Sequence, residues 1–281
     1  DDIQCKHIHL KPALYVFALN VIISIYLQLN NVLLGFMKDT EAVGYFTAAT
    51  KIMVITMSIS SALGAVIMPR TSNLIAEERM DEFKALVQKS YDFIFALAMP
   101  LMVGLIFTSP SAVLLLSGEG FVPAILTSQI VAFNILTVGL SGVMGIQVLY
   151  PLGKINIVIL CTSIGAIINV FLNVLLIPRY GHNGTAVAYM LAEMTVTVSM
   201  FFIGKRYIPI RFLKRQHLNY VLGSVVMGVC LYFISWLGLG NTATLVMMIS
   251  MGGIVYVVIL LFLRDSIGMI PWKILREKFG K

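Results

Sequence analysis

The chain has 281 residues, of which 59% are apolar and only 12% are charged, and its mean hydropathy is +0.93. Soluble domains contain roughly 45–50% apolar and about 25% charged residues, so this composition excludes a water-soluble globular protein. The formal net charge of +7 comes from Lys and Arg placed between apolar stretches. Such placement is typical of contact with an anionic membrane leaflet, and no nucleic-acid partner is expected.

Eight apolar stretches follow one another along the chain, and each reaches the roughly 20 residues that a helix needs to cross a bilayer. They are residues 12–36, 44–68, 90–116, 122–149, 155–177, 184–204, 218–239 and 242–263. Among all charged residues, only Lys51, Asp92 and Glu193 fall inside these stretches. Because charges avoid lipid, the sequence predicts an all-α polytopic membrane protein with about eight transmembrane helices.

The basic residues set the expected orientation. All Lys and Arg residues except Lys38, Lys51 and Arg179 lie in the connections on one side, which also holds both ends of the chain. Since Lys and Arg are enriched in cytoplasmic loops, both ends are expected in the cytoplasm. The opposite connections are very short, so neighbouring helices should form antiparallel hairpins. Residues 69–89 have the pattern of an amphipathic helix lying along the inner leaflet.

A basic connection containing Pro209 divides the series into six stretches followed by two. We therefore expect residues 1–206 to form a six-helix lobe and residues 207–281 to form two additional transmembrane helices with a basic cytoplasmic tail. The chain begins Asp-Asp without Met, and its first apolar stretch is too long for a signal-peptide core of about 7–15 residues. Residue 1 is therefore expected to be a cut inside a longer protein.

Polar side chains follow one face of the first stretch, which a helix that only had to sit in lipid would not need. They are Asn20, Ser24, Gln28 and Asn31, at steps of four, four and three residues. In the fifth stretch Asn169 and Asn173 lie one turn apart. Polar faces on several helices predict a shared cavity. The alternative is that each amide only forms a hydrogen bond across a helix contact.

The charged residues inside the stretches are further candidates. Lys51 lies in the outer third of its stretch, where it either contacts an anion such as phosphate or extends to the membrane surface. Glu193 lies near the middle of the sixth stretch, where it could bind a proton or a cation, or form a structural bond between helices. Asp92 is expected only to mark the cytoplasmic start of its helix.

Signals for enzymatic chemistry are absent from the sequence. The four histidines, His7, His9, His182 and His217, form no metal-ligand cluster, and there is no nucleotide-binding glycine loop. We therefore expect no catalysis, no metal and no cofactor.

A resemblance to a known family lies in residues 172–193, LNVLLIPRYGHNGTAVAYMLAE. This segment resembles the signature of Wzx-like polysaccharide flippases, which belong to the MATE-like multidrug/oligosaccharidyl-lipid/polysaccharide exporter superfamily. The matching positions are Asn173, Ile177, Pro178, Tyr180, Gly181, Gly184, Ala186, Ala188 and Glu193. Residues 151–154 (PLGK) and 43–52 (VGYFTAATKI) resemble the same family in the same order. In residues 172–193, Gly181 and Gly184 suit a tight external turn.

The resemblance implies a function and a larger protein. Such flippases export an undecaprenyl-pyrophosphate-linked oligosaccharide repeat unit across the bacterial inner membrane for capsule, exopolysaccharide or O-antigen assembly. They work by alternating access between two six-helix lobes. The chain would then be the C-terminal part of a 14-helix transporter. Its partners would be the missing N-terminal lobe, the bilayer, the lipid-linked substrate and other glycan-assembly proteins.

The resemblance also suggests roles for single residues. A cation-lined cavity in such flippases makes Lys51, in the matching stretch 43–52, the expected pyrophosphate contact. The amides expected in the cavity are Asn20, Gln28, Asn31, Asn169 and Asn173. Glu193 could serve coupling to protons or sodium ions.

Several alternatives stay open. Within the superfamily, the protein could be a multidrug antiporter or a peptidoglycan-precursor flippase. From a different class, it could be a membrane-embedded polysaccharide polymerase or acyltransferase, although such enzymes should carry a sizeable catalytic loop, which this chain lacks. A scaffold of a glycan-assembly complex is a third alternative.

Overall fold

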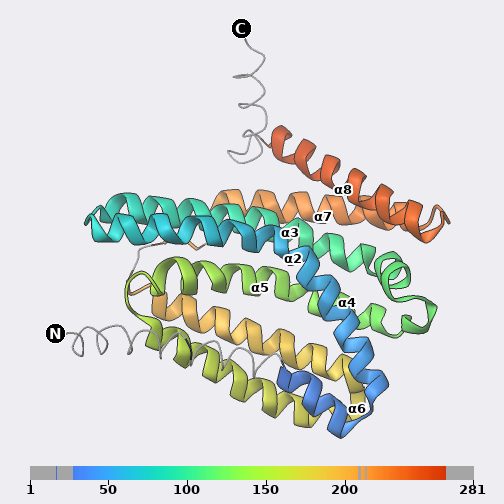
Figure 1. The fold of residues 1–281 in the computed structure, drawn as a ribbon. Coiled ribbons are helices and arrows are strands. Elements are labelled where there is room, and N and C mark those ends of the chain that lie inside the picture. Colours follow the sequence, from blue (N-terminus) through green and yellow to red (C-terminus); the bar gives the residue numbers. More distant parts are fainter. Residues whose placement is uncertain (1–16, 18–27, 208–209, 213, 264–281) are drawn as a thin grey trace, which may run out of the picture.

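The computed structural model describes residues 17, 28–207, 210–212 and 214–263. Every regular element within these residues is helical, and most of the long helices lie roughly parallel to one another (Figure 1). Residues 28–37 are helical and precede the labelled elements. The elements are α2 (Thr40–Ala76), α3 (Met80–Ser117), η1 (Glu119–Phe121), α4 (Ala124–Val131), α5 (Phe133–Gly142), the π-helix η2 (Val143–Leu149), α6 (Ile155–Gly204), α7 (Arg215–Ser235) and α8 (Asn241–Phe262).

The prediction of an all-α polytopic membrane protein is confirmed. Within the described residues, five helices are long and apolar enough to cross a membrane: α3, the continuous segment Ala124–Leu149, α6, α7 and α8. The 50-residue α6 contains two of the predicted stretches, because it folds back on itself as a hairpin (Figure 1).

The reversal of α6 confirms the predicted tight turn and explains its glycines. Gly181 has φ +53° and ψ −131°, a conformation that side chains with a Cβ rarely adopt. A Cβ added to Gly184 would lie 2.6 Å from the carbonyl oxygen of Leu176, so the two arms can approach only because Gly184 has no side chain. Deeper in the hairpin, a Cβ on Gly165 would lie 3.3 Å from the carbonyl oxygen of Ala192. Small residues therefore set the spacing of the two arms.

The expectation of a separate amphipathic helix over residues 69–89 is wrong. Helix α2 continues through Pro69 to Ala76, a turn over residues 77–79 reverses the chain, and α3 begins at Met80. Arg79 holds the turn, because its guanidinium bonds the carboxylates of Glu77 and Glu82 at 2.7 Å, and these acids raise the pKa of Arg79. Of the apolar side chains of this pattern, Phe83 and Val87 are buried in the core of the protein.

Contacts between connections define two ends of the helix bundle. At the first, the ammonium of Lys154 lies 5.6 Å from the ring centre of Tyr207, which brings the turn after η2 next to the connection that follows α6. We call this the basic end, because the connection from α6 to α7 carries four Lys and Arg residues, Lys205, Arg206, Arg211 and Lys214, and α7 begins with Arg215. At the opposite end, Asn183 Oδ1 in the α6 turn accepts a 2.8 Å hydrogen bond from Thr127 of α4.

The last two helices pack on α3 and form their own core with it. Tyr220, Met227 and Leu231 of α7 and Met248 and Tyr256 of α8 are buried there. Glycines allow close approach: a Cβ on Gly228 of α7 would lie 3.0 Å from the side chain of Val103 in α3. The predicted boundary between residues 206 and 207 lies in the connection before α7, and the division into six helices plus two stays a prediction.

Candidate functional site

A polar pocket lies between the helical residues 28–37, α2 and the second arm of α6. It has a volume of about 360 Å³. Its lining includes three residues that the sequence pattern predicted for a cavity, Gln28, Asn31 and Lys51. They come from two helices whose polar faces meet, and Thr47 Oγ1 of α2 donates a long hydrogen bond of 3.4 Å to Asn31 Oδ1. Gln28, Asn31 and Lys51 thus share one pocket, and their role as substrate contacts stays a prediction.

Lys51 gives the pocket its charge. Among the described residues that line it, Lys51 is the single charged side chain, and none of the described carboxylates forms an ion pair with it. An ammonium group within a membrane domain is costly unless it meets water or an anion. As a compact point charge with three donors, Lys51 can bind a phosphate oxygen from several directions.

Asn169 and Asn173 do not line this pocket. Both are fully buried, and they form a cluster of three amides with Asn30. Asn173 Nδ2 donates to Asn30 Oδ1 at 2.9 Å, to the backbone oxygen of Asn169 at 2.9 Å and to Asn169 Oδ1 at 3.1 Å. The cluster joins the first arm of α6 to residues 28–37. Asn30 belongs to both places, because it also lines the pocket.

The other predicted site residues lie elsewhere. Asn20 is outside the described residues. Glu193 is half-buried on the second arm of α6 and does not line the pocket, whereas Tyr189, one turn earlier, does. The sequence pattern missed Asn30, Thr50 and Tyr189 as lining residues. Asn30 adjoins Asn31, and only the polarity of this pair could have drawn attention to it.

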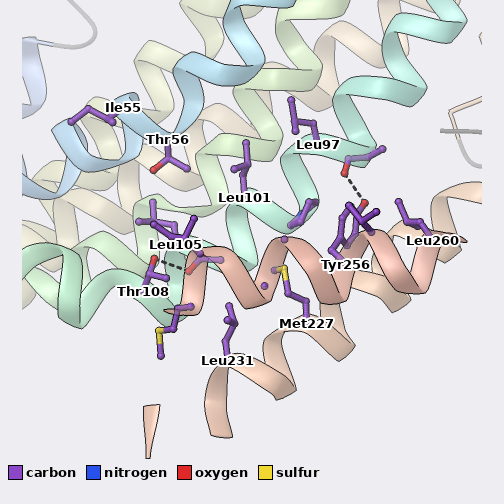
Figure 2. A pocket seen from close by; sticks show the side chains of 18 of the residues that line it. Ile55, Thr56, Leu97, Leu101, Leu105, Thr108, Met227, Leu231, Tyr256 and Leu260 are labelled. Atoms are coloured by element: carbon purple, nitrogen blue, oxygen red, sulfur yellow. Dashed lines mark hydrogen bonds between the residues drawn. The ribbon is translucent and has the colours of Figure 1, made fainter. Parts of the chain in front are cut away.

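A larger apolar groove lies beside the polar pocket, and Figure 2 shows its walls. Its volume is about 730 Å³, and its walls come from α3, α7 and α8, with Ile55 and Thr56 of α2 at one edge. The labelled side chains from α3 include Leu97, Leu101 and Leu105 (Figure 2). The groove is thus formed mainly by helices that are apolar enough to cross a membrane.

The few hydroxyl groups in the groove are already bonded to the protein. Thr56 and Thr108 donate to backbone oxygens one turn back, at 3.0 and 2.8 Å. Tyr256 of α8 donates to the backbone oxygen of Ala96 in α3 at 2.6 Å (Figure 2). A ligand in the groove therefore meets hydrocarbon, which suits an alkyl or isoprenoid chain.

The polar pocket and the apolar groove meet at Ile55, which lines both. Lys51 lies one helical turn before Ile55 on α2. A molecule with an anionic head and an apolar tail could therefore contact both sites at once. Nothing in the described part of the chain suggests metal chemistry, since no group of three His, Cys, Asp or Glu side chains could hold an ion there.

The sequence of this chain is similar to those of several known proteins. A family described as "Polysaccharide biosynthesis protein" matches residues 8–126. A probable low-salt glycan biosynthesis flippase of Haloferax volcanii, Agl15, is 24% identical over 237 residues, which are 84% of this chain and 50% of that protein. An uncharacterized membrane protein of Methanocaldococcus jannaschii is 21% identical over 173 residues, which are 62% of this chain and 34% of that protein.

A solved structure has the same fold. The lipid II flippase MurJ in an inward closed conformation matches with a TM-score of 0.76 at 17% sequence identity, over 89% of this chain and 53% of that chain. The chain thus spans about half the length of both the Haloferax volcanii flippase and MurJ.

The fold defines a class, the polytopic all-helical membrane proteins. These matches support the resemblance to polysaccharide flippases of the MATE-like multidrug/oligosaccharidyl-lipid/polysaccharide exporter superfamily. The relatives with a named function are flippases, which move molecules across a membrane and are not enzymes.

Proposed function

We propose that this chain is the C-terminal part of a flippase that moves a lipid-linked glycan precursor across a membrane. The observation that carries the proposal is the adjoining pair of sites on α2. Lys51 and the amides of the polar pocket suit the phosphate and sugar groups of such a precursor, and the apolar groove suits its lipid chain.

The lipid carrier and the membrane can also be proposed. By the family resemblance, the substrate is an undecaprenyl-pyrophosphate-linked oligosaccharide, and the membrane is the bacterial inner membrane with both ends of this chain in the cytoplasm. The product would serve capsule, exopolysaccharide or O-antigen assembly. The names of the relatives, a glycan biosynthesis flippase and a lipid II flippase, support a lipid-linked glycan in general. The positive charges at the basic end support the orientation.

Alternating access would need a second lobe, since the family resemblance implies two lobes and this chain spans about half the length of its relatives with a named function. In this proposal, residues 1–206 supply one wall of a central cavity and the missing lobe supplies the other. Residues 207–281 add the two helices that, with α3, form the groove.

The test uses the full-length parent protein in a bacterial strain that lacks its own repeat-unit flippase. Surface polymer should return, and lipid-linked repeat units should stop accumulating. If drug resistance appeared instead and the lipid-linked units stayed, the protein would be a multidrug antiporter. Restored growth of a strain that lacks its lipid II flippase would favour a peptidoglycan precursor as the substrate.

A further inference from the structure

The connection between α6 and α7 is attached to one face of α3 by side chains one turn apart. Gln88 Oε1 accepts from the backbone N–H of Arg211 at 2.8 Å, and Gln88 Nε2 lies 3.3 Å from the backbone oxygen of the same residue. Tyr91 donates to the backbone oxygen of Phe212 at 3.1 Å. Residues Arg211 and Phe212, shortly before α7, are thus fastened to α3 by hydrogen bonds to their backbone.

Asp92 is the centre of this attachment. Its carboxylate is mostly buried and accepts three hydrogen bonds: from Lys214 Nζ at 2.6 Å, from Gln88 Nε2 at 2.8 Å and from His217 Nε2 at 3.0 Å. Lys214 is the residue before α7, and His217 lies in the first turn of α7. Asp92 therefore joins the start of α7 to α3. The sequence did not predict this contact, because Asp92 was expected only to mark the start of its helix.

The orientation of the His217 ring follows from its neighbours. The backbone N–H of Lys214 points at Nδ1 at 3.1 Å, so Nδ1 must carry a lone pair. The proton of the neutral ring then lies on Nε2, where it donates to Asp92. The ring is 1% exposed and stacks on Phe95 with a centroid distance of 4.7 Å. His217 thus caps α7 and bonds α3 with the same ring.

This attachment lies at the end of the apolar groove. Phe93, the residue after Asp92, lines the groove, and so does Ala96, whose carbonyl oxygen is bonded by Tyr256 of α8. Asp92 and Ala96 lie one turn apart on α3. The first is bonded to the start of α7 and the second to α8. The position of these helices determines the opposite wall of the groove.

We propose that Asp92 is a positioning residue for the groove: through Lys214 and His217 it holds the start of α7 on α3, and its loss releases the connection that precedes α7. The partners expected to act through it are Lys214, His217 and Gln88. The proposal concerns a contact within the chain and not the transported substrate, so it can fail while the proposed function stands.

The connection itself provides the measurement, because its Lys and Arg residues are trypsin sites. A docked segment resists cleavage, and its cleavage rate rises with the fraction of molecules in which it is released. The full-length protein in detergent micelles would be treated with trypsin, and the fragment cut within residues 205–215 would be quantified over time. The variants are Asp92→Ala, Asp92→Glu and His217→Phe. Asp81→Ala is the matched control, since Asp81 is fully exposed on the same helix.

Asp92→Ala should be cut at least tenfold faster within this connection than the wild type. His217→Phe should be cut severalfold faster, because it keeps the ring on Phe95 but loses both hydrogen bonds. Asp92→Glu should recover most of the protection, which a loss of general stability would not explain. Asp81→Ala should behave as the wild type.

Equal cleavage of Asp92→Ala and the wild type would overturn the proposal. It would also be overturned if Asp92→Glu were cut as fast as Asp92→Ala, since the carboxylate would then not be the attachment. If Asp92→Ala does not accumulate, the cleavage rate of His217→Phe tests the proposal. Cleavage of that variant at the wild-type rate would contradict it.

Discussion

Asn173 Nδ2 donates a 2.9 Å hydrogen bond to Asn30 Oδ1 across 143 positions of the sequence. Both side chains are buried, and Asn30 also lines the polar pocket. The bond therefore connects the interior of the α6 hairpin to the wall of the candidate site. It assigns to Asn173 a role in holding the pocket together rather than in contacting what enters it.

Replacing Asn173 should therefore lower stability first. Asn173→Leu removes the donor to Asn30 Oδ1 and Asn169 Oδ1, and a buried polar group left without its partner costs about 1–3 kcal/mol. We expect a fall of several degrees in the melting temperature of the purified full-length protein. Asn31→Ala, at a half-exposed pocket residue, should lower transport and leave the melting temperature near that of the wild type. The opposite pattern would contradict the assigned roles.

Replacing the pocket cation should lower transport without lowering stability. Lys51→Gln keeps a polar side chain, one atom shorter, and removes the charge that the proposal assigns to phosphate binding. Clearance of lipid-linked repeat units by the full-length protein should fall at least tenfold, at an unchanged protein level. Lys89→Gln changes an exposed lysine at the basic end and is the control, expected to clear the units normally. Normal clearance by Lys51→Gln would remove the phosphate assignment.

Filling the apolar groove should also impair transport. Gly253 lines the groove and a Cβ there would meet no atom within 4 Å, so Gly253→Phe places a ring at the groove wall. We expect slower clearance of lipid-linked units and a melting temperature that is unchanged or slightly higher. Val258→Phe, at an exposed position of α8 that does not line the groove, places the same ring outside the groove as a control. Equal effects of both changes would mean that the groove holds no lipid chain.

The hairpin glycines should resist substitution. Gly184→Ala places a Cβ 2.6 Å from the carbonyl oxygen of Leu176, and such overpacking costs about 1–3 kcal/mol. Gly181→Ala forces an alanine to φ +53°, at a cost of roughly 1–2 kcal/mol. Thermal unfolding should detect both changes. Gly142→Ala, where a Cβ meets nothing within 4 Å, is the matched control. A melting temperature of Gly184→Ala equal to that of Gly142→Ala would contradict the close approach seen here.

The spacing of charges and the length of the apolar stretches determined the class of fold, because lipid excludes charge and a bilayer requires helices of a minimum length. The turn at Gly181 was likewise predictable, because glycine readily adopts the positive φ that such a turn uses. Gln28, Asn31 and Lys51 could be predicted for one cavity, because helical periodicity places polar residues on common faces.

Only the tertiary structure decided which polar residues face the pocket and which are buried. Asn31 and Asn173 look alike in the sequence, yet the first lines a pocket and the second closes an amide cluster, because the packing of α6 against residues 28–37 is a long-range relationship. Asp92 looked like a helix-start charge, and its partners Lys214 and His217 lie more than 120 positions away. Helical periodicity determines the faces of each helix, but the helix packing determines what each face meets.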